Sequence, residues 1–184
     1  MRHAQELRDL MVNDAFRCRV LSLVRSLKLD DCWIGAGFVR NAVWNNLHNN
    51  PSVHDGDIDV IWFDEKANKS TDREIEANLS ELEPTIKWSV KNQARMHTRN
   101  SDAPYASTID AMRYWPETAT AIAVRLSNQC QCEIAAPFGL GDPYGLKVKP
   151  TPSFQKDKRH IFDDRVKKKN WLSIWPQLEV VDWR

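Results

Sequence analysis

The stretch "DGDIDVIWFD" at residues 55–64 begins with aspartates and continues as a buried β-strand. Alternate residues of a strand point to the same side of a sheet, so Asp57 and Asp59 share one face, roughly 6–7 Å apart at Cα. The same face continues with Ile61 and Phe63, which indicates that the two acids lie at the mouth of the strand. Like charges at this distance repel, and we expect a positive group between them.

Two carboxylates at the open end of a strand form a good binding site for a divalent cation. Mg²⁺ is held in proteins by one or two carboxylates and completes its coordination with phosphate oxygens and water. Asp57 and Asp59 therefore predict a site for Mg²⁺ or Mn²⁺. The alternative is that Asp55 and Gly56 form a turn and that the acids only guard the entrance of the strand.

The second informative stretch is "WIGAGFVRNAV", residues 33–43, which predicts a strand, a tight turn and the start of a helix. Unpaired backbone N–H groups and the positive end of the helix dipole meet at such a turn, and this arrangement suits a phosphate. Gly35 and Gly37 form the turn, Gly37 lets a ligand approach the backbone, and Arg40 is a candidate for a bidentate phosphate contact. A simple turn without a ligand is the alternative.

Together, a phosphate-binding helix start and an Asp-x-Asp strand entrance are what metal-dependent transfer to or from a nucleoside triphosphate needs. The chain here resembles the nucleotidyltransferase superfamily that includes DNA polymerase β and the tRNA CCA-adding enzymes. Their shared pattern is a Gly-rich turn that opens a helix, followed by Asp-x-Asp/Glu on the next strand. "AGFVRN" is similar to the Gly-Gly-x-Val-Arg-Asp of the CCA-adding enzymes, with Ala36 in place of the first glycine and Asn41 in place of the aspartate.

Longer stretches extend the resemblance over nearly the whole chain. They are similar to one small family of bacterial nucleotidyltransferase-like proteins and comprise "WIGAGFVRNAVWNNLH", "DIDVIWFD", "WSVKNQARMH", "PYASTIDAM", "WPETATAIAVRL", "APFGLGDPYGLKVKPTP" and "KKKNW". The resemblance implies the nucleotidyltransferase fold, an α/β (α+β) arrangement with a short mixed β-sheet flanked by helices. It does not imply a particular substrate.

The superfamily resemblance implies a third carboxylate on a later strand beside the Asp-x-Asp strand. Glu133 in "QCEIAAP" is the first candidate, because it lies among alternating apolar residues that end at Pro137. An exposed position on an edge strand is the alternative for this residue. Asp110 in "STIDAM" is the second candidate, with a helix cap as its alternative. The predicted catalytic and metal-binding set is therefore Asp57, Asp59 and Glu133.

Polar residues also gather in "VKNQARMH", residues 90–97, where they are Lys91, Asn92, Arg95 and His97. Asn92 and Arg95 are predicted to contact the nucleotide, at its base or its phosphates, or to orient the acceptor. The alternative is a polar strand end that hydrogen bonds tie to its neighbours. His97 is the histidine whose polar surroundings best suit proton transfer.

Hydrophobic periodicity predicts the order of the elements. Helices are expected within residues 3–28, 38–48, 70–83 and the basic tail, and strands at 32–35, 58–63, 85–92, 119–126 and 131–138. We expect a break in the first helical region at Asn13 and Asp14, and an N-cap at Ser70 or Thr71. No linker indicates a second domain, so residues 1–184 are predicted to form a single domain.

The composition excludes several classes of protein. The 184 residues carry a net charge of only +1, which creates no overall field for nucleic acid or a membrane surface. No run is long enough to span a membrane, and the charged N-terminus does not resemble a secretory signal. The four cysteines lack the spacing of a zinc site and indicate reduced thiols in a cytoplasmic protein. The basic tail is a candidate for holding a triphosphate or an RNA backbone, with a solvated helix face as its alternative.

We therefore expect an enzyme that transfers a nucleoside monophosphate from an NTP to an acceptor hydroxyl and releases pyrophosphate. Asp57, Asp59 and Glu133 would hold the metal, and Gly37 and Arg40 would hold the triphosphate. The acceptor would be a small molecule, a protein side chain or an RNA end, and no membrane partner is expected. The alternatives are a non-catalytic nucleotide- or metal-binding protein with the same fold, and a metal-dependent phosphoesterase.

Overall fold

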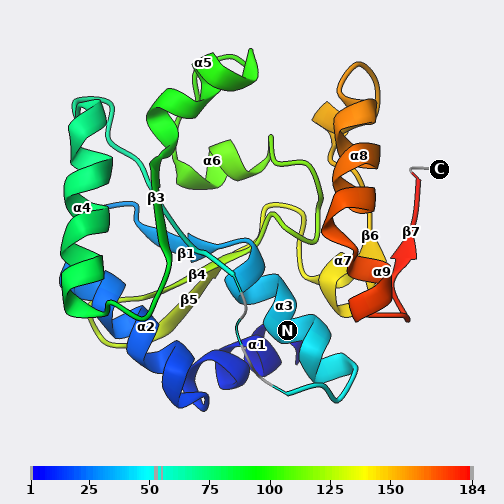
Figure 1. Cartoon of the computed structure of the whole chain (residues 1–184), viewed down its shortest axis with the longest axis horizontal. Coiled ribbons are helices and arrows are strands. Elements are labelled where there is room, and N and C mark those ends of the chain that lie inside the picture. Colours follow the sequence, from blue (N-terminus) through cyan, green and yellow to red (C-terminus); the bar gives the residue numbers. More distant parts are fainter. Residues whose placement is uncertain (1, 52–53, 55, 183–184) are drawn as a thin grey trace.

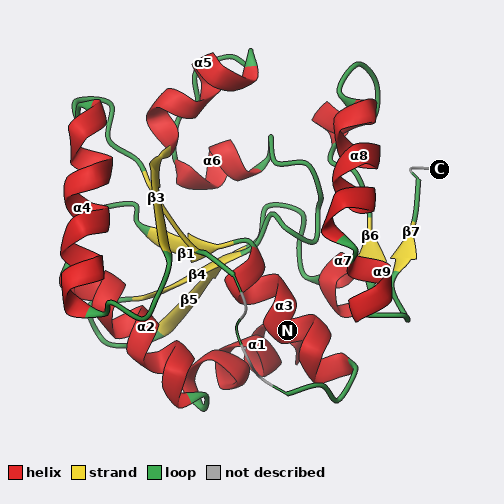
Figure 2. Ribbon diagram, viewed as in Figure 1, coloured by secondary structure: helices red, strands yellow, loops and turns green. Residues whose placement is uncertain are grey.

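The computed structural model describes residues 2–51, 54 and 56–182, which form a mixed sheet flanked by helices (Figure 1; Figure 2). The main sheet has five strands in the order β3-β2-β1-β4-β5. Their bounds are β1 Trp33–Gly35, β2 Ile58–Trp62, β3 Trp88–Asn92, β4 Ala123–Leu126 and β5 Cys132–Ala135. β2 and β3 run parallel, and the other neighbouring pairs are antiparallel. The predicted fold class is confirmed, while the alternative of a turn at Asp55 and Gly56 is not tested because Asp55 lies outside the described residues.

Four helices cover one face of the sheet and enclose the larger core. They are α1 (Arg2–Val12), α2 (Ala15–Ser26), α3 (Gly37–Leu47) and α4 (Lys69–Leu82). The predicted break between the first two helices is confirmed, because the Asp14 side chain caps α2 by accepting from the Arg17 N–H. The cap of α4 is Asn68 rather than Ser70 or Thr71, since its side-chain oxygen accepts from both of their N–H groups at 2.8 and 3.2 Å.

The opposite face of the sheet carries a smaller core. Its buried members are Trp33, Ile61, Met112, Ala121, Ala123 and Ala135. After β3 the chain runs through η1 (Gln93–Arg95) and α5 (Met96–Asn100) to α6 (Thr108–Met112), which contributes Met112 to this core. Asp59 precedes Ile61 by two residues and therefore lies on this face.

The end of the chain packs against α3 as a small module (Figure 1). Its elements are α7 (Gly141–Tyr144), β6 (Lys147–Val148), η2 (Pro152–Phe154), α8 (Arg159–Lys169), α9 (Trp171–Ile174) and β7 (Glu179–Val180). The Trp44 ring of α3 meets the rings of Trp171 and Trp175 edge-on, with centroids 5.6 and 5.1 Å apart. No helix within the described ranges has the length and apolarity needed to cross a lipid bilayer.

The turn that joins β1 to α3 is strained at Ala36. This residue has φ 54° and ψ −122°, a conformation that glycine adopts readily and that costs a residue with a Cβ about 1–3 kcal/mol. Hydrogen bonds hold it there, because the Ala36 N–H donates to the Ile122 carbonyl at 3.1 Å and the Ala36 carbonyl accepts from the Arg40 N–H at 2.9 Å. Ala36 therefore occupies a position of this turn whose backbone conformation favours glycine.

Replacing Ala36 with glycine is therefore expected to stabilise the protein. We expect Ala36→Gly to raise the free energy of unfolding by about 1 kcal/mol, because the strain relieved exceeds the entropy that glycine adds to the unfolded chain. Ala36→Val is expected to lower it by at least as much, since a β-branched residue tolerates positive φ poorly. Equilibrium urea denaturation measures both changes. A glycine variant no more stable than the wild type would contradict the assignment of strain to Ala36.

Candidate functional site

Asp57 and Asp59 lie at the beginning of β2, near the middle of the main sheet. Asp57 immediately precedes the strand, and Asp59 is its second residue. In the register of the sheet, Asp59 stands opposite Gly35 of β1 and Ser89 of β3. The side chain of Asp57 is 44% exposed, whereas Asp59 is partly buried. The structure therefore places the two acids together, with one more accessible than the other.

The surroundings of Asp59 raise the pKa of its carboxyl group. Burial is the largest cause, and the negative charge of Asp57 acts in the same direction. The Ser89 hydroxyl, opposite Asp59 on β3, and the charges of Arg165 and Arg40 favour the ionised form, but they do not outweigh the first two effects. A cation between the two aspartates would relieve both unfavourable effects, so this pair fits a divalent metal ion.

The positive group expected beside the acids is present as Lys87. Its Nζ lies 2.6 Å from Asp57 Oδ1, and this hydrogen bond raises the pKa of the lysine. The Lys87 side chain is 78% exposed, so water screens the ion pair and its contribution to stability is small. A divalent cation can therefore replace the ammonium group at Asp57. Asp57 and Asp59 fit one Mg²⁺ or Mn²⁺ that also takes phosphate oxygens and water.

The structure does not bring Glu133 to the two aspartates, which contradicts its predicted position beside them. Glu133 lies on β5 at the far edge of the sheet, with β1 and β4 between β5 and β2. Three strand spacings separate it from Asp59, about 14 Å or more at Cα. Its carboxylate accepts from Arg125 Nε at 2.6 Å and is 42% exposed. Glu133 is therefore the exposed edge residue of the alternative interpretation.

Asp110 does not supply a third carboxylate either. Its Oδ2 accepts from the Ala106 N–H at 3.0 Å, and its own N–H donates to Ser107 Oγ at 3.0 Å, so it stabilises the start of α6. Among the residues that the structure describes, no three His, Cys, Asp or Glu side chains lie close enough together to hold a metal ion. The neighbour of Asp59 on β3 is instead the hydroxyl of Ser89.

The N-terminus of α3 lies beside the acids, because Gly35 is paired with Asp59. A Cβ on Gly35 would lie 3.0 Å from Trp115 Cη2 and 3.3 Å from Ile61 Cδ1, so this position is tightly packed. At Gly37 the nearest atom to such a Cβ would be 3.7 Å away. Gly37 is partly exposed, and the positive end of the helix dipole suits an anion there.

Arg40 is buried, so the structure does not present it to a triphosphate as predicted. It is 5% exposed, and its Nη1 donates to Thr120 Oγ1 at 2.6 Å while Nε and Nη2 donate to Asn41 Oδ1. Its guanidinium lies 4.9 Å from the Trp44 ring and 4.5 Å from the Trp171 ring. Burial lowers the pKa of Arg40 to about 10. Arg40 therefore contributes positive charge from inside the protein.

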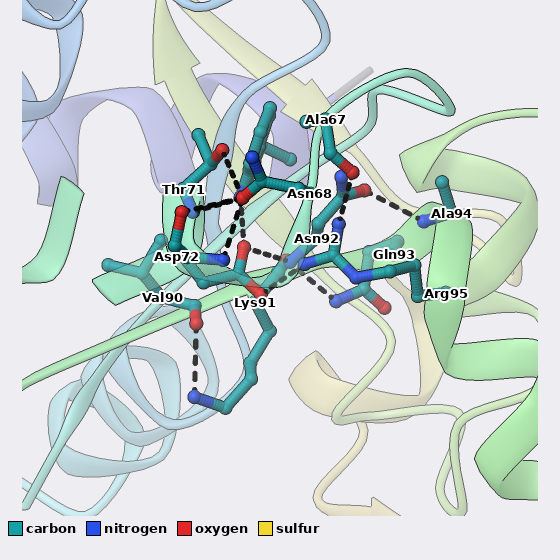
Figure 3. A network of polar contacts seen from close by, with 12 residues as sticks. Ala67, Asn68, Thr71, Asp72, Val90, Lys91, Asn92, Gln93, Ala94 and Arg95 are labelled. Atoms are coloured by element: carbon teal, nitrogen blue, oxygen red, sulfur yellow. Dashed lines mark hydrogen bonds and ion pairs between the residues drawn. The ribbon is translucent and has the colours of Figure 1, made fainter. Parts of the chain in front are cut away.

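Asn92 and Arg95 belong to a network that ties the end of β3 to the start of α4 (Figure 3). The buried Asn92 amide donates to the Asp64 carbonyl at 2.7 Å and accepts from the Ala94 N–H at 3.0 Å. Arg95 Nη2 donates to Asp72 Oδ2 at 2.6 Å. These contacts support the alternative of a polar strand end, and a contact of Asn92 or Arg95 with the nucleotide stays a prediction.

The remaining polar residues of this segment also contact the backbone. Lys91 Nζ donates to the Val90 carbonyl at 3.0 Å, and His97 Nδ1 lies 2.8 Å from the Ala94 carbonyl oxygen. Lys91 follows Ser89 by two residues and shares its face of the sheet. It is therefore the member of this segment that lies on the same face as the acids.

Three further residues were not predicted from the sequence: Ser89 and Arg165, which act on Asp59, and Glu117, which accepts from Arg165. The alternation of apolar and polar residues in the β3 segment indicates the face of the sheet on which Ser89 lies. It does not indicate that β3 pairs with β2, which sets Ser89 opposite Asp59. Arg165 lies in the basic tail, and its Nε donates to the buried carboxylate of Glu117 at 2.6 Å across 48 residues of sequence. No spacing in the sequence indicates that contact, because it depends on how α8 packs.

Comparison with known proteins gives one family match and several structural likenesses. A profile described as nucleotidyltransferase matches residues 22–180. The sequence matches no curated protein. A solved structure described as revealing a CCA-adding enzyme head domain is 36% identical, with a TM-score of 0.88, and the match covers 97% of this chain and 96% of that one.

Two larger enzymes share the fold at lower identity. A CCA-adding enzyme in complex with CTP is 16% identical, with a TM-score of 0.58 over 95% of this chain and 43% of that one. A tRNA-processing enzyme complex is 16% identical, with a TM-score of 0.55 over 88% of this chain and 43% of that one. The present chain thus spans less than half the length of either enzyme, and the likeness concerns the fold alone.

The structural role of Asn92 predicts a loss of stability when its side chain is removed. We expect Asn92→Ala to lower the free energy of unfolding by about 2–4 kcal/mol, because it leaves buried backbone groups without partners. Lys91→Ala, an exposed neighbour, should change it by less than about 0.5 kcal/mol. Urea denaturation measures both. A stable Asn92→Ala protein with weakened NTP binding would instead support the original prediction of a nucleotide contact.

The raised pKa of Asp59 predicts that Asp59→Asn stabilises the metal-free protein at neutral pH. The folded state binds this proton more tightly than the unfolded state, whose pKa is about 3.9. As the pH rises from there through the folded pKa, ionisation of Asp59 costs stability, and at pH 7 the cost is fully present. The amide avoids this cost, so we expect a melting temperature about 2–4 °C above the wild type at pH 7.

The gain should shrink as the pH falls from 7 toward the unfolded pKa, because the wild-type carboxyl group takes up a proton in the folded state before it does so in the unfolded state. Melting curves followed by circular dichroism in EDTA, at several values between pH 4 and pH 7, measure the difference. Glu133→Gln serves as the control, because the structure places this carboxylate at the sheet edge. A difference between Asp59→Asn and wild type that does not change with pH would contradict the proposed cost of ionisation.

Proposed function

Because the chain belongs to the nucleotidyltransferase family, we propose that it transfers a nucleoside monophosphate from an NTP to an acceptor hydroxyl and releases pyrophosphate. The observation that carries the proposal is the pairing of β1 with β2, which sets Gly35 directly opposite Asp59. This pairing brings the partly exposed helix start at Gly37 next to the two aspartates. A phosphate site beside a metal site is the arrangement that nucleotidyl transfer needs.

In this proposal Asp57 and Asp59 hold Mg²⁺ or Mn²⁺. The bound ion would offset the charge that develops on the transferred phosphoryl group and would acidify the acceptor hydroxyl. Ser89 lies opposite Asp59 on β3 and favours its ionised form, which suits a metal ligand. Asp59, whose pKa is raised, is the candidate to accept the proton of the acceptor hydroxyl.

The backbone of Gly37 and the dipole of α3 hold the NTP phosphates in this proposal. The buried charge of Arg40 adds a positive potential behind the same turn, which favours an anion without touching it. Most of the rate acceleration would come from alignment of the acceptor with the phosphorus and from electrostatic stabilisation of the transition state. The protein would therefore contribute to catalysis by holding Asp57, Asp59 and the N-terminus of α3 in a fixed arrangement.

The acceptor is not specified by this geometry. A small molecule, a protein side chain and an RNA end each offer a hydroxyl group of the required chemistry. The larger structural relatives include a tRNA-processing enzyme, which makes an RNA end one of the acceptors to test. Transfer of a label from the NTP, rather than inspection of the site, identifies the acceptor class.

A second function is favoured by one observation, the number of carboxylates at the site. Within the described part of the chain, Asp57 and Asp59 have no third acid beside them, and Ser89 takes the neighbouring position on β3. A protein that binds an NTP and a metal ion without transferring the nucleotide fits this arrangement. Transfer and binding without transfer are separated by the same experiment.

The experiment incubates the purified protein with each α-labelled NTP and Mg²⁺ or Mn²⁺, with and without cell extract. Transfer predicts that label moves to an acceptor while pyrophosphate is released. We expect Asp57→Asn and Asp59→Asn each to reduce the rate by about 100-fold or more, because each removes a metal ligand. Asp110→Asn and Glu133→Gln are matched controls that the structure places away from the pair, and they should retain activity.

Each alternative function has its own result in this assay. Binding of NTP with neither label transfer nor pyrophosphate release would support the non-catalytic protein. Release of phosphate without transfer would support a phosphoesterase. Full NTP and metal affinity in both aspartate variants would contradict the assignment of Asp57 and Asp59 to the site.

A further inference from the structure

We propose that Arg165 of α8 binds the triphosphate of the NTP, so that the end of the chain completes the site begun by β2 and α3. The inference rests on the proposed function and names the side chain that takes the role first predicted for Arg40. The exposure of the two arginines distinguishes them, because Arg40 is 5% exposed and the Arg165 side chain is 33% exposed.

The Trp171 ring of α9 links Arg165 of α8 to the start of α3, because the guanidinium carbon atoms of Arg165 and Arg40 lie 5.7 and 4.5 Å from its centroid. The charge of Arg165 reaches Asp59, where it favours the ionised carboxylate, and it also reaches the buried Arg40. Arg159 on the same helix is paired differently, with Asp163 at 2.9 Å and Asp182 at 2.7 Å. Of these two α8 arginines, Arg165 is therefore the one that shares the Trp171 ring with Arg40 and whose charge acts on Asp59.

Glu117 holds one edge of the Arg165 guanidinium and leaves the other edge open. Arg165 Nε donates to Glu117 Oε1 at 2.6 Å, and the glutamate side chain is 1% exposed. The Glu117 backbone is fixed in a turn, because its carbonyl accepts from the N–H groups of Thr120 and Ala121 at 3.1 Å. Within the described residues, the two Nη groups of Arg165 have no hydrogen-bond partner. An open Nη edge on an anchored guanidinium can bind a phosphate with little further loss of side-chain entropy.

The charges around the site also favour an anion once a metal is bound. Arg40, Arg165 and Glu117 together carry two positive charges and one negative charge, which leaves +1. A divalent cation would balance the two negative charges of Asp57 and Asp59, so the +1 at the arginines would remain for the triphosphate. Glu117 Oε2 is buried and has no hydrogen-bond partner among the described residues, and the positive charges of the two arginines compensate it.

The test compares the affinities of variants for inorganic pyrophosphate and for NTP, each with Mg²⁺, by isothermal titration calorimetry on the full chain. We expect Arg165→Ala to weaken both by about 10–100-fold, the loss that removal of a charge-assisted bidentate contact produces. Mn²⁺ affinity, measured by electron paramagnetic resonance without nucleotide, should change by less than about twofold, because Arg165 does not hold the metal.

Two further variants control for charge and for folding. Arg159→Ala removes the same charge from the same helix and should bind pyrophosphate as the wild type does. Arg165→Lys keeps the charge but not the planar fork, and it should lose about five- to tenfold in affinity. Melting curves establish which variants are folded at the temperature of the titration. If Arg165→Ala does not fold, the lysine variant decides the question.

The possible results separate this inference from the proposed function. A wild-type protein that binds neither NTP nor pyrophosphate with either metal would overturn both. A wild type that binds them, with folded Arg165 variants of equal affinity, would overturn only the role of Arg165. Selective loss of pyrophosphate and NTP affinity in the Arg165 variants, with Mn²⁺ affinity and Arg159→Ala unchanged, would support it.

Discussion

The buried guanidinium of Arg40 joins three parts of the chain. It lies over the rings of Trp44 and Trp171, at 4.9 and 4.5 Å, and donates to the hydroxyl of Thr120. Burial of a charge is costly, and it lowers the pKa of Arg40 to about 10, but the rings, the hydroxyl group and the charge of Glu117 compensate. The helix α3, the segment before β4 and α9 near the end of the chain therefore meet at one side chain.

Two unfavourable features lie side by side where the proposed function needs them. Asp59 is partly buried next to the charge of Asp57, and the turn that follows the neighbouring strand is strained at Ala36. Proteins accumulate such local conflicts at functional sites, because a binding site must present groups that a ligand, rather than the protein, will satisfy. In contrast, the polar groups of Asn92 are satisfied by the protein itself, which is why that residue is structural.

Local patterns in the sequence predicted most of the elements correctly. The alternation of residues 58–63 predicted β2, and the polar break at Asn13 and Asp14 predicted the boundary between two helices, because each depends on neighbours a few positions away. The cap of α4 was misplaced by two or three residues, since Asn68 satisfies the N–H groups of both predicted caps. The nucleotidyltransferase fold itself was predicted from the resemblance of whole motifs and is supported by the family comparison.

The sequence by itself determined the aspartate pair, because residues two apart on a strand must share a face. It also determined the turn at Gly35 and Gly37, and the order of predicted helices and strands indicated a mixed sheet with helices packed on it. Only the tertiary structure decided that Glu133 lies three strands from the pair, and that a glutamate and an arginine 48 residues apart form an ion pair near it. Strand order and helix packing depend on contacts between distant segments. Whether a polar side chain binds a ligand or another part of the protein depends on those contacts. The spacing of residues within one segment does not predict them.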